Sequence, residues 1–153
     1  GITPDLMSLA KPLASGLPIG AALMTEKVHS ALNPGDHGST FAAGALVCSV
    51  ANHVVTRISK PEFLAHVNEV SEYLFERLAE INSPHIKDIR GRGLMIGIEM
   101  DIPAAEVVQA GYENGLLLVG AGANTIRLLP PLIIEKSDVD IAIKCLSGIF
   151  AKQ

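Results

Sequence analysis

The chain has 153 residues, of which 48% are hydrophobic and 18% are charged, and its formal net charge at pH 7 is −4. This composition predicts a globular protein with a hydrophobic core rather than a disordered segment. It argues against nucleic acid as a partner, and no apolar run approaches the roughly 20 residues that a membrane-spanning helix needs. Cys48 and Cys145 lie far apart and in no metal-binding spacing, so no metal site is expected.

The first part of the chain is expected to alternate short strands with turns. Apolar runs at 6–10 and 20–24 predict buried strands, and a short helix at 26–32 ends at Asn33-Pro34-Gly35. A longer helix over 42–58 has so little polar surface that it is expected to be largely buried. A buried strand needs neighbouring strands, and none precedes the first run. We therefore expect a fragment whose amino-terminal part is missing.

The second part is expected to form a compact domain of helices and short strands. Ser59-Lys60-Pro61-Glu62 is typical of a capping box, and it opens an amphipathic helix that runs to residue 81. The elements that follow are strands at 86–89 and 94–100, a helix at 103–114, strands at 116–119 and 125–129, and a final helix capped by Ser137-Asp138-Val139-Asp140. The expected class is α/β, with an incomplete α/β piece at 1–59 and an α+β domain at 60–153.

Lys11 stands where the first expected strand meets a loop that proline and glycine break. The ends of strands in α/β sheets are frequent ligand sites, and a lysine amine with little access to solvent can act there as a nucleophile. Judged by its position alone, a solvated lysine after a strand is the more common case.

The polar loop at 35–40 precedes the expected long helix. Its backbone N–H groups, the hydroxyls of Ser39 and Thr40 and the start of the helix together suit a phosphate group. The alternative is an ordinary helix cap, in which Ser39 or Thr40 accepts hydrogen bonds from free N–H groups of the helix.

Arg127 lies in an otherwise apolar strand, and alternation places its side chain on the face opposite to Ile126 and Leu128. Its guanidinium either binds a substrate carboxylate or faces water at an edge of the sheet, and the sequence leaves both open. Arg90 and Arg92 are expected to be solvated arginines of a hairpin turn.

Four segments, in this order along the chain, resemble the class-III (ornithine-type) pyridoxal-phosphate aminotransferases. They are residues 4–11 with 16–21, 35–41, 90–99 and 126–132. The first is similar to the family's cofactor-lysine motif, the second to its phosphate loop, and the other two to signatures of its small domain. Four motifs in family order outweigh the positional argument against Lys11.

The resemblance implies pyridoxal 5′-phosphate (PLP) as the cofactor, held by Lys11 as a Schiff base. The freed amine of Lys11 would then move a proton during the reaction. Ser39 and Thr40 would bind the cofactor phosphate of the neighbouring subunit, which implies a homodimer with shared active sites. Arg127 would bind the α-carboxylate of the substrate.

The resemblance also implies a fold-type-I PLP-dependent transferase. Residues 1–59 would be the incomplete end of its large PLP-binding domain, and residues 60–153 its carboxyl-terminal α+β small domain. Residues 42–45 lack the proline that the family usually has after the phosphate loop, which puts the affinity for the cofactor in doubt.

Residues 11–14 and 35–41 favour a family member that moves an amino group from N2-acetylornithine to 2-oxoglutarate, a step of arginine biosynthesis. The alternatives are an ornithine 5-aminotransferase or other class-III ω-aminotransferase, and a non-catalytic truncated fragment. Because much of the family's cofactor site would precede residue 1, the chain alone is expected to be inactive. The parent protein would be cytoplasmic, or mitochondrial or plastidial in a eukaryote.

Overall fold

A computed structural model describes residues 1–152 of the chain. They divide into two compact units, which we call unit 1, Gly1–Phe63, and unit 2, which begins at Leu64. The division falls inside helix α3 (Pro61–Ala79) rather than before it. The assignment of 1–59 and 60–153 to a large and a small domain stays a prediction.

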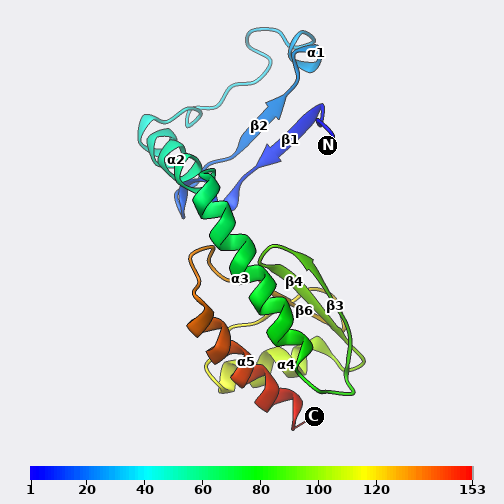
Figure 1. Ribbon diagram of the computed structural model, residues 1–153. Coiled ribbons are helices and arrows are strands. Elements are labelled where there is room, and N and C mark those ends of the chain that lie inside the picture. The colour runs from blue at the N-terminus through cyan, green and yellow to red at the C-terminus, as the bar shows by residue number, and fades with distance from the viewer. Residues whose placement is uncertain (153) are drawn as a thin grey trace. The chain divides into compact units, whose positions relative to one another are not determined.

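Unit 1 contains one antiparallel strand pair and three helical segments. Strand β1 (Leu6–Leu9) pairs with β2 (Ala21–Met24), so that Leu6 lies opposite Met24. The helical segments are the 3-10 turn η1 (Lys11–Ala14), α1 (Glu26–His29) and α2 (Ala45–Ile58), and η1 packs against α2. Figure 1 shows β1 and β2 side by side, with η1 between them along the chain. The two predicted strands and both predicted helices are present.

The burial predicted for this part of the chain is wrong. All four residues of β1 are exposed, with Leu6 at 61%, and Ala51 is the one buried residue of α2. The apolar pattern was interpreted correctly as strand and helix. Burial, however, needs a second layer, and the described residues of unit 1 place none over β1 or the outer side of α2.

Unit 2 is a four-stranded antiparallel sheet with three helices. The strands β3 (Ile86–Arg92), β4 (Met95–Met100), β5 (Val119–Gly120) and β6 (Thr125–Leu128) lie in the order β3-β4-β6-β5. The helices are α3, α4 (Ala104–Glu113) and α5 (Lys136–Phe150). Helices α3 and α4 and strand β4 lie close to their predicted ranges.

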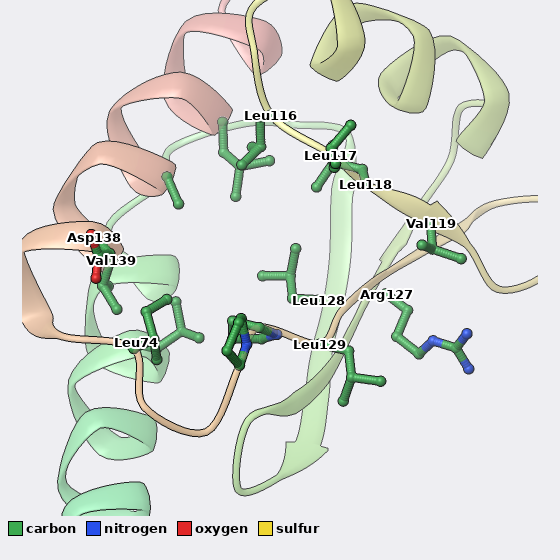
Figure 2. A pocket seen from close by; sticks show the side chains of 15 residues that line it. Leu74, Leu116, Leu117, Leu118, Val119, Arg127, Leu128, Leu129, Asp138 and Val139 are labelled. Carbon is green, nitrogen blue, oxygen red and sulfur yellow. The ribbon is translucent and has the colours of Figure 1, made fainter. Parts of the chain in front are cut away.

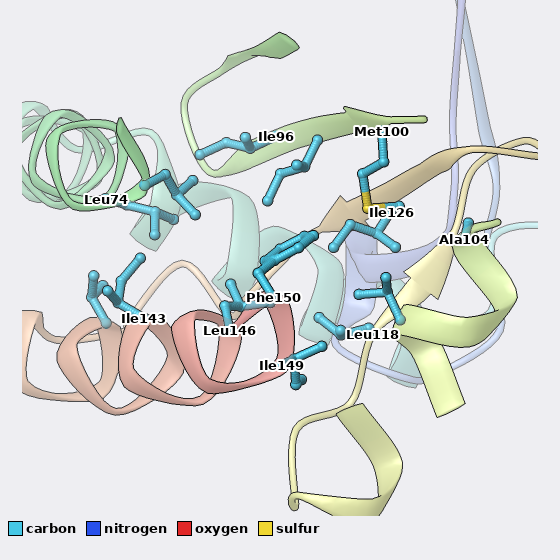
Figure 3. Close-up of a cluster of buried hydrophobic side chains, with 14 of the residues drawn as sticks. Leu74, Ile96, Met100, Ala104, Leu118, Ile126, Ile143, Leu146, Ile149 and Phe150 are labelled. Atoms are coloured by element: carbon cyan, nitrogen blue, oxygen red, sulfur yellow. The ribbon is translucent and has the colours of Figure 1, made fainter. Parts of the chain in front are cut away.

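One face of this sheet builds the core. Ile96 and Ile98 of β4 and Ile126 of β6 are fully buried, and Figure 3 shows side chains from α5, among them Leu146 and Phe150, gathered against the sheet. Burial of a side chain of this size stabilises a fold by about 1.5–3 kcal/mol. Because side chains alternate between the two faces along each strand, the burial of these isoleucines also determines which residues face away from the helices.

Two boundaries differ from the predictions for local reasons. Strand β3 continues to Arg92, because the turn is made by Gly93 and Leu94, with Gly93 at a φ of +56°. Ser71 of α3 stabilises this turn, because its hydroxyl donates a 2.7 Å hydrogen bond to the Gly93 carbonyl. The final helix has Glu135 as its cap, in a capping box with Asp138, rather than Ser137.

Gly91→Ala is expected to destabilise unit 2. A Cβ at Gly91 would collide with the Met95 carbonyl oxygen and come within 2.8 Å of Ile96 Cα. Backbone atoms cannot turn aside as a flexible side chain can, so the expected loss of unfolding free energy is on the order of 2 kcal/mol or more. Urea unfolding of the full-length protein measures it.

Gly97→Ala is the matched control on the neighbouring strand. Its Cβ would meet Thr125 Cγ2 at 3.5 Å and the Arg90 carbonyl oxygen at 3.8 Å, which are ordinary contacts. The expected change is below about 1 kcal/mol. Equal losses in the two variants would contradict this description of the hairpin.

Candidate functional site

Lys11 lies at an abrupt turn of the chain, directly after β1 and at the start of η1. Its φ is +54°, in the left-handed region that residues other than glycine rarely adopt, and Ala10 before it is fully extended. The side chain is exposed, and within residues 1–152 it forms no ion pair. Strain of this kind is frequently found at functional sites, which supports a role for this lysine.

The loop before α2 leaves its hydroxyl groups available. Ser39 Oγ accepts one long hydrogen bond, 3.4 Å from the N–H of Phe41, and Thr40 is exposed. Neither side chain caps the helix, because α2 begins at Ala45 and its cap residue is Gly44. The helix-cap alternative is therefore wrong, since Ala43, at a φ of +54°, and Gly44 separate the hydroxyls from the helix start.

A pocket of about 300 Å³ lies where this loop meets the start of α2. It is lined by Pro18, Ile19, Gly20, Ser39, Phe41, Ala42, Ala43, Gly44, Val47 and Cys48. The first N–H groups of α2 have no side-chain cap, so this end of the helix can receive an anion. The structure brings Ser39 to this pocket, whereas Lys11 and Thr40 do not line it.

Arg127 belongs to unit 2 and projects from the face of the sheet that the helices leave open. It lies opposite Gly97 on one side and Val119 on the other, while its neighbour Ile126 is fully buried. Figure 2 shows its side chain pointing away from the apolar wall that Leu74 and Val139 help to form. The position is exposed but not at the edge of the sheet, because β6 lies between β4 and β5.

A second pocket, of about 460 Å³, lies beside Arg127 in unit 2. Its walls come from α3, α5, the segment before β5 and residues 129–131, which follow β6, and they are mostly leucine, valine and proline side chains. Arg127 and Asp138 are its charged members. Arg127 thus combines an open guanidinium with an adjoining apolar surface.

Sequence reasoning missed the ion pairs of Arg90, which lie on the same face of the sheet as Arg127. Arg90 was expected in a turn, but it lies within β3 and donates hydrogen bonds to Asp88 at 2.8 Å and to Glu99 at 2.5 Å. The hydrogen bonds to Asp88 and Glu99 raise the pKa of the Arg90 guanidinium above its ordinary value. Two-residue alternation, applied through residue 92, would have placed Arg90 on a sheet face.

The described residues hold neither a metal-binding cluster nor a helix that could span a membrane. Within residues 1–152, no three histidine, cysteine, aspartate or glutamate side chains gather in a way that could bind a metal ion. No helix of this part of the chain has the length and apolar character to cross a bilayer.

Comparison with known proteins identifies the family. The model of the family described as "Aminotransferase class-III" matches residues 1–150, and the chain belongs to that family. The family and the α/β fold class predicted from the sequence are both confirmed.

Individual relatives are longer than this chain. The mitochondrial acetylornithine aminotransferase of Alnus glutinosa is 45% identical over 97% of this chain, which spans 34% of that protein. An acetylornithine aminotransferase structure from Elizabethkingia anophelis has a TM-score of 0.89 at 26% identity, covering 99% of this chain and 42% of its own. An ornithine aminotransferase structure from Toxoplasma gondii, with PLP in partial occupancy at its active site, has a TM-score of 0.89 at 31% identity, covering 99% and 37%.

The strain at Lys11 gives a prediction that does not depend on the cofactor. Lys11→Gly and Lys11→Ala both remove the amine, but only glycine adopts the left-handed conformation without steric cost. The glycine variant is expected to be more stable than the alanine variant by about 1 kcal/mol. Thermal unfolding of the two cofactor-free proteins measures the difference. An alanine variant of equal or greater stability would show that the position is unstrained.

Proposed function

We propose that the full-length protein is a PLP-dependent aminotransferase that moves an amino group from N2-acetylornithine to 2-oxoglutarate, a step of arginine biosynthesis. The observation that carries this proposal is Lys11, held in a strained turn at the end of a strand, within a chain of the class-III family. The proposed donor is supported by relatives named as acetylornithine aminotransferases at 37–45% identity.

The residues present suit the chemistry of PLP, which has an aldehyde and a phosphate. The amine of Lys11 is unpaired among residues 1–152 and can bind the aldehyde carbon. Free hydroxyls at Ser39 and Thr40 and the uncapped start of α2 match what a phosphate needs. We assign Ser39 and Thr40 to the phosphate held by the neighbouring subunit, so the active enzyme would be a homodimer with shared sites.

Bound PLP supplies an electron sink for the carbon that carries the amino group. Lys11 holds the cofactor in the resting enzyme and, once its amine is free, takes the proton from that carbon at Nζ and later returns it. Arg127 orients the 2-oxo acid by a two-pronged ion pair with its α-carboxylate, while the apolar pocket beside it excludes water.

The two units would correspond to parts of one larger enzyme. We assign residues 1–59 to the end of a large cofactor-binding domain and residues 60–153 to the small domain. The exposed apolar residues of β1 and α2 support this, because a large domain would supply the layer that covers them. The similar proteins include mitochondrial and bacterial ones, so the compartment would be the mitochondrion, the plastid or the cytoplasm.

A second candidate donor is ornithine itself. Several structural neighbours are ornithine aminotransferases, among them the one from Toxoplasma gondii at 31% identity. A parallel assay of the full-length protein with N2-acetylornithine and with ornithine separates the two, since the preferred donor has the higher kcat/KM.

Cofactor attachment tests the proposed role of Lys11. PLP added to the full-length protein is expected to give a protonated-imine absorbance band, and borohydride reduction should fix the adduct on the peptide that carries Lys11. Lys11→Ala should abolish both signals, whereas Lys27→Ala, another exposed lysine of unit 1, should change neither. Adducts scattered over surface lysines would refute the assignment.

Substitution of Arg127 tests its proposed part in binding. Arg127→Lys keeps the charge but loses the planar fork, so the KM for 2-oxoglutarate is expected to rise about tenfold or more. Arg127→Gln should raise it further, by roughly another tenfold. Steady-state kinetics at saturating amino donor measures both. A KM unchanged in Arg127→Gln would assign the carboxylate to another residue.

A further inference from the structure

The open face of the unit 2 sheet carries carboxylates close to the arginine proposed to bind a substrate carboxylate. We define this open face as the side away from the buried isoleucines. Its members are Asp88, Arg90, Arg92, Met95, Gly97, Glu99, Val119, Thr125 and Arg127. Any carboxylate here that paired with Arg127 would compete with a substrate for the same guanidinium.

The strand register makes Glu99 such a competitor. Gly97 pairs with Arg90 on one side and with Arg127 on the other, and Glu99 lies two residues further along the same strand. Glu99 is therefore a diagonal neighbour of both arginines, at a separation of about 7–8 Å that long side chains can bridge. Gly97 has no side chain, so nothing at this position shields Arg127 from Glu99.

In the structure, however, Glu99 forms its ion pair with Arg90 and not with Arg127. Arg90 Nη1 lies 2.5 Å from Glu99 Oε2 and 2.8 Å from Asp88 Oδ2. Within residues 1–152 Arg127 forms no ion pair at all. One arginine thus engages both acidic side chains of the face, and the other remains open.

We propose that Arg90 is a positioning residue that holds Glu99 and thereby keeps Arg127 free for the carboxylate of the 2-oxo acid. The proposal rests on the carboxylate-binding role proposed for Arg127. Without Arg90, Glu99 has one arginine left within reach, and the pair that forms with Arg127 competes with the substrate. Arg90 acts through Glu99 and does not touch the substrate.

A double-mutant cycle in the full-length, PLP-saturated protein tests this proposal. Arg90→Gln is expected to raise the KM for 2-oxoglutarate roughly twofold to fivefold with little change in kcat, because an exposed pair competes only modestly. Adding Glu99→Gln removes the competitor and is expected to restore the KM. A general loss of structure cannot explain such a rescue, since the double variant also lacks the ion pair.

Arg92→Gln is the matched control, because Arg92 lies on the same strand and face and forms no ion pair among the described residues. It should leave the KM unchanged. An equal effect in Arg92→Gln would show that the net charge of the face is responsible. A double variant that keeps the raised KM would show that Arg90 contacts the substrate itself. Either result overturns the proposal.

Calorimetric dissociation constants for 2-oxoglutarate provide a readout that needs no turnover. The same pattern is expected across the cycle, with weaker binding in Arg90→Gln and recovery in the double variant. The Arg127→Gln variant distinguishes a failure of the role of Arg127 from a failure of the role of Arg90. If it leaves the dissociation constant unchanged, the role of Arg127 fails, and with it the basis of the proposal. If it weakens binding but the Glu99 rescue fails, only the role of Arg90 is refuted.

Discussion

The two-residue alternation of β4 and β6 is the constraint on which the rest of unit 2 depends. It sends Ile96, Ile98 and Ile126 into the core and leaves Gly97 and Arg127 on the opposite face. A register slip of one residue would bury the guanidinium and expose the isoleucines. Such a slip is unfavourable, because it would lose the apolar surface that the isoleucines bury against the helices. The same strand register therefore determines both the core packing and the orientation of the candidate carboxylate site.

Unit 1 differs from unit 2, because its candidate functional residues lie on a part of the fold that has little cover. Lys11 occupies a strained turn, Ser39 lies at a pocket, and the apolar residues of β1 and α2 are exposed. Stored strain of this kind persists where surrounding structure holds it in place. In the enzyme that we propose, the large domain and the partner subunit supply those surroundings.

Much of this could be predicted from the sequence, because local patterns determine it. The periodicity that predicts α3 and the alternation around Arg127 depend on residues that are neighbours in the chain. The exposure of β1, the start of α2 and the ion pairs of Arg90 depend instead on distant segments or on single backbone angles. The ordered motifs led to the family, whereas Arg90 needed the register of β3 against β4 to become visible.

Some differences arose where two local signals compete. Ser137 is a good helix cap by residue type, but the helix is capped two residues earlier, at Glu135, which forms a reciprocal pair of hydrogen bonds with Asp138. Likewise, Gly91 and Gly93 suggested a turn around Arg90 and Arg92. Strand β3 instead continues through Gly91 to Arg92, because the turn at Gly93 and Leu94 closes the hairpin.

The most direct test of the account is a transamination assay of the full-length protein with N2-acetylornithine and 2-oxoglutarate, with Lys11→Ala and the isolated 153-residue chain alongside. Glutamate is expected to form with the full-length protein, and not with the Lys11→Ala variant or the isolated chain. Glutamate formation that survives in Lys11→Ala, or its absence in the full-length protein with every amino donor, would contradict the account.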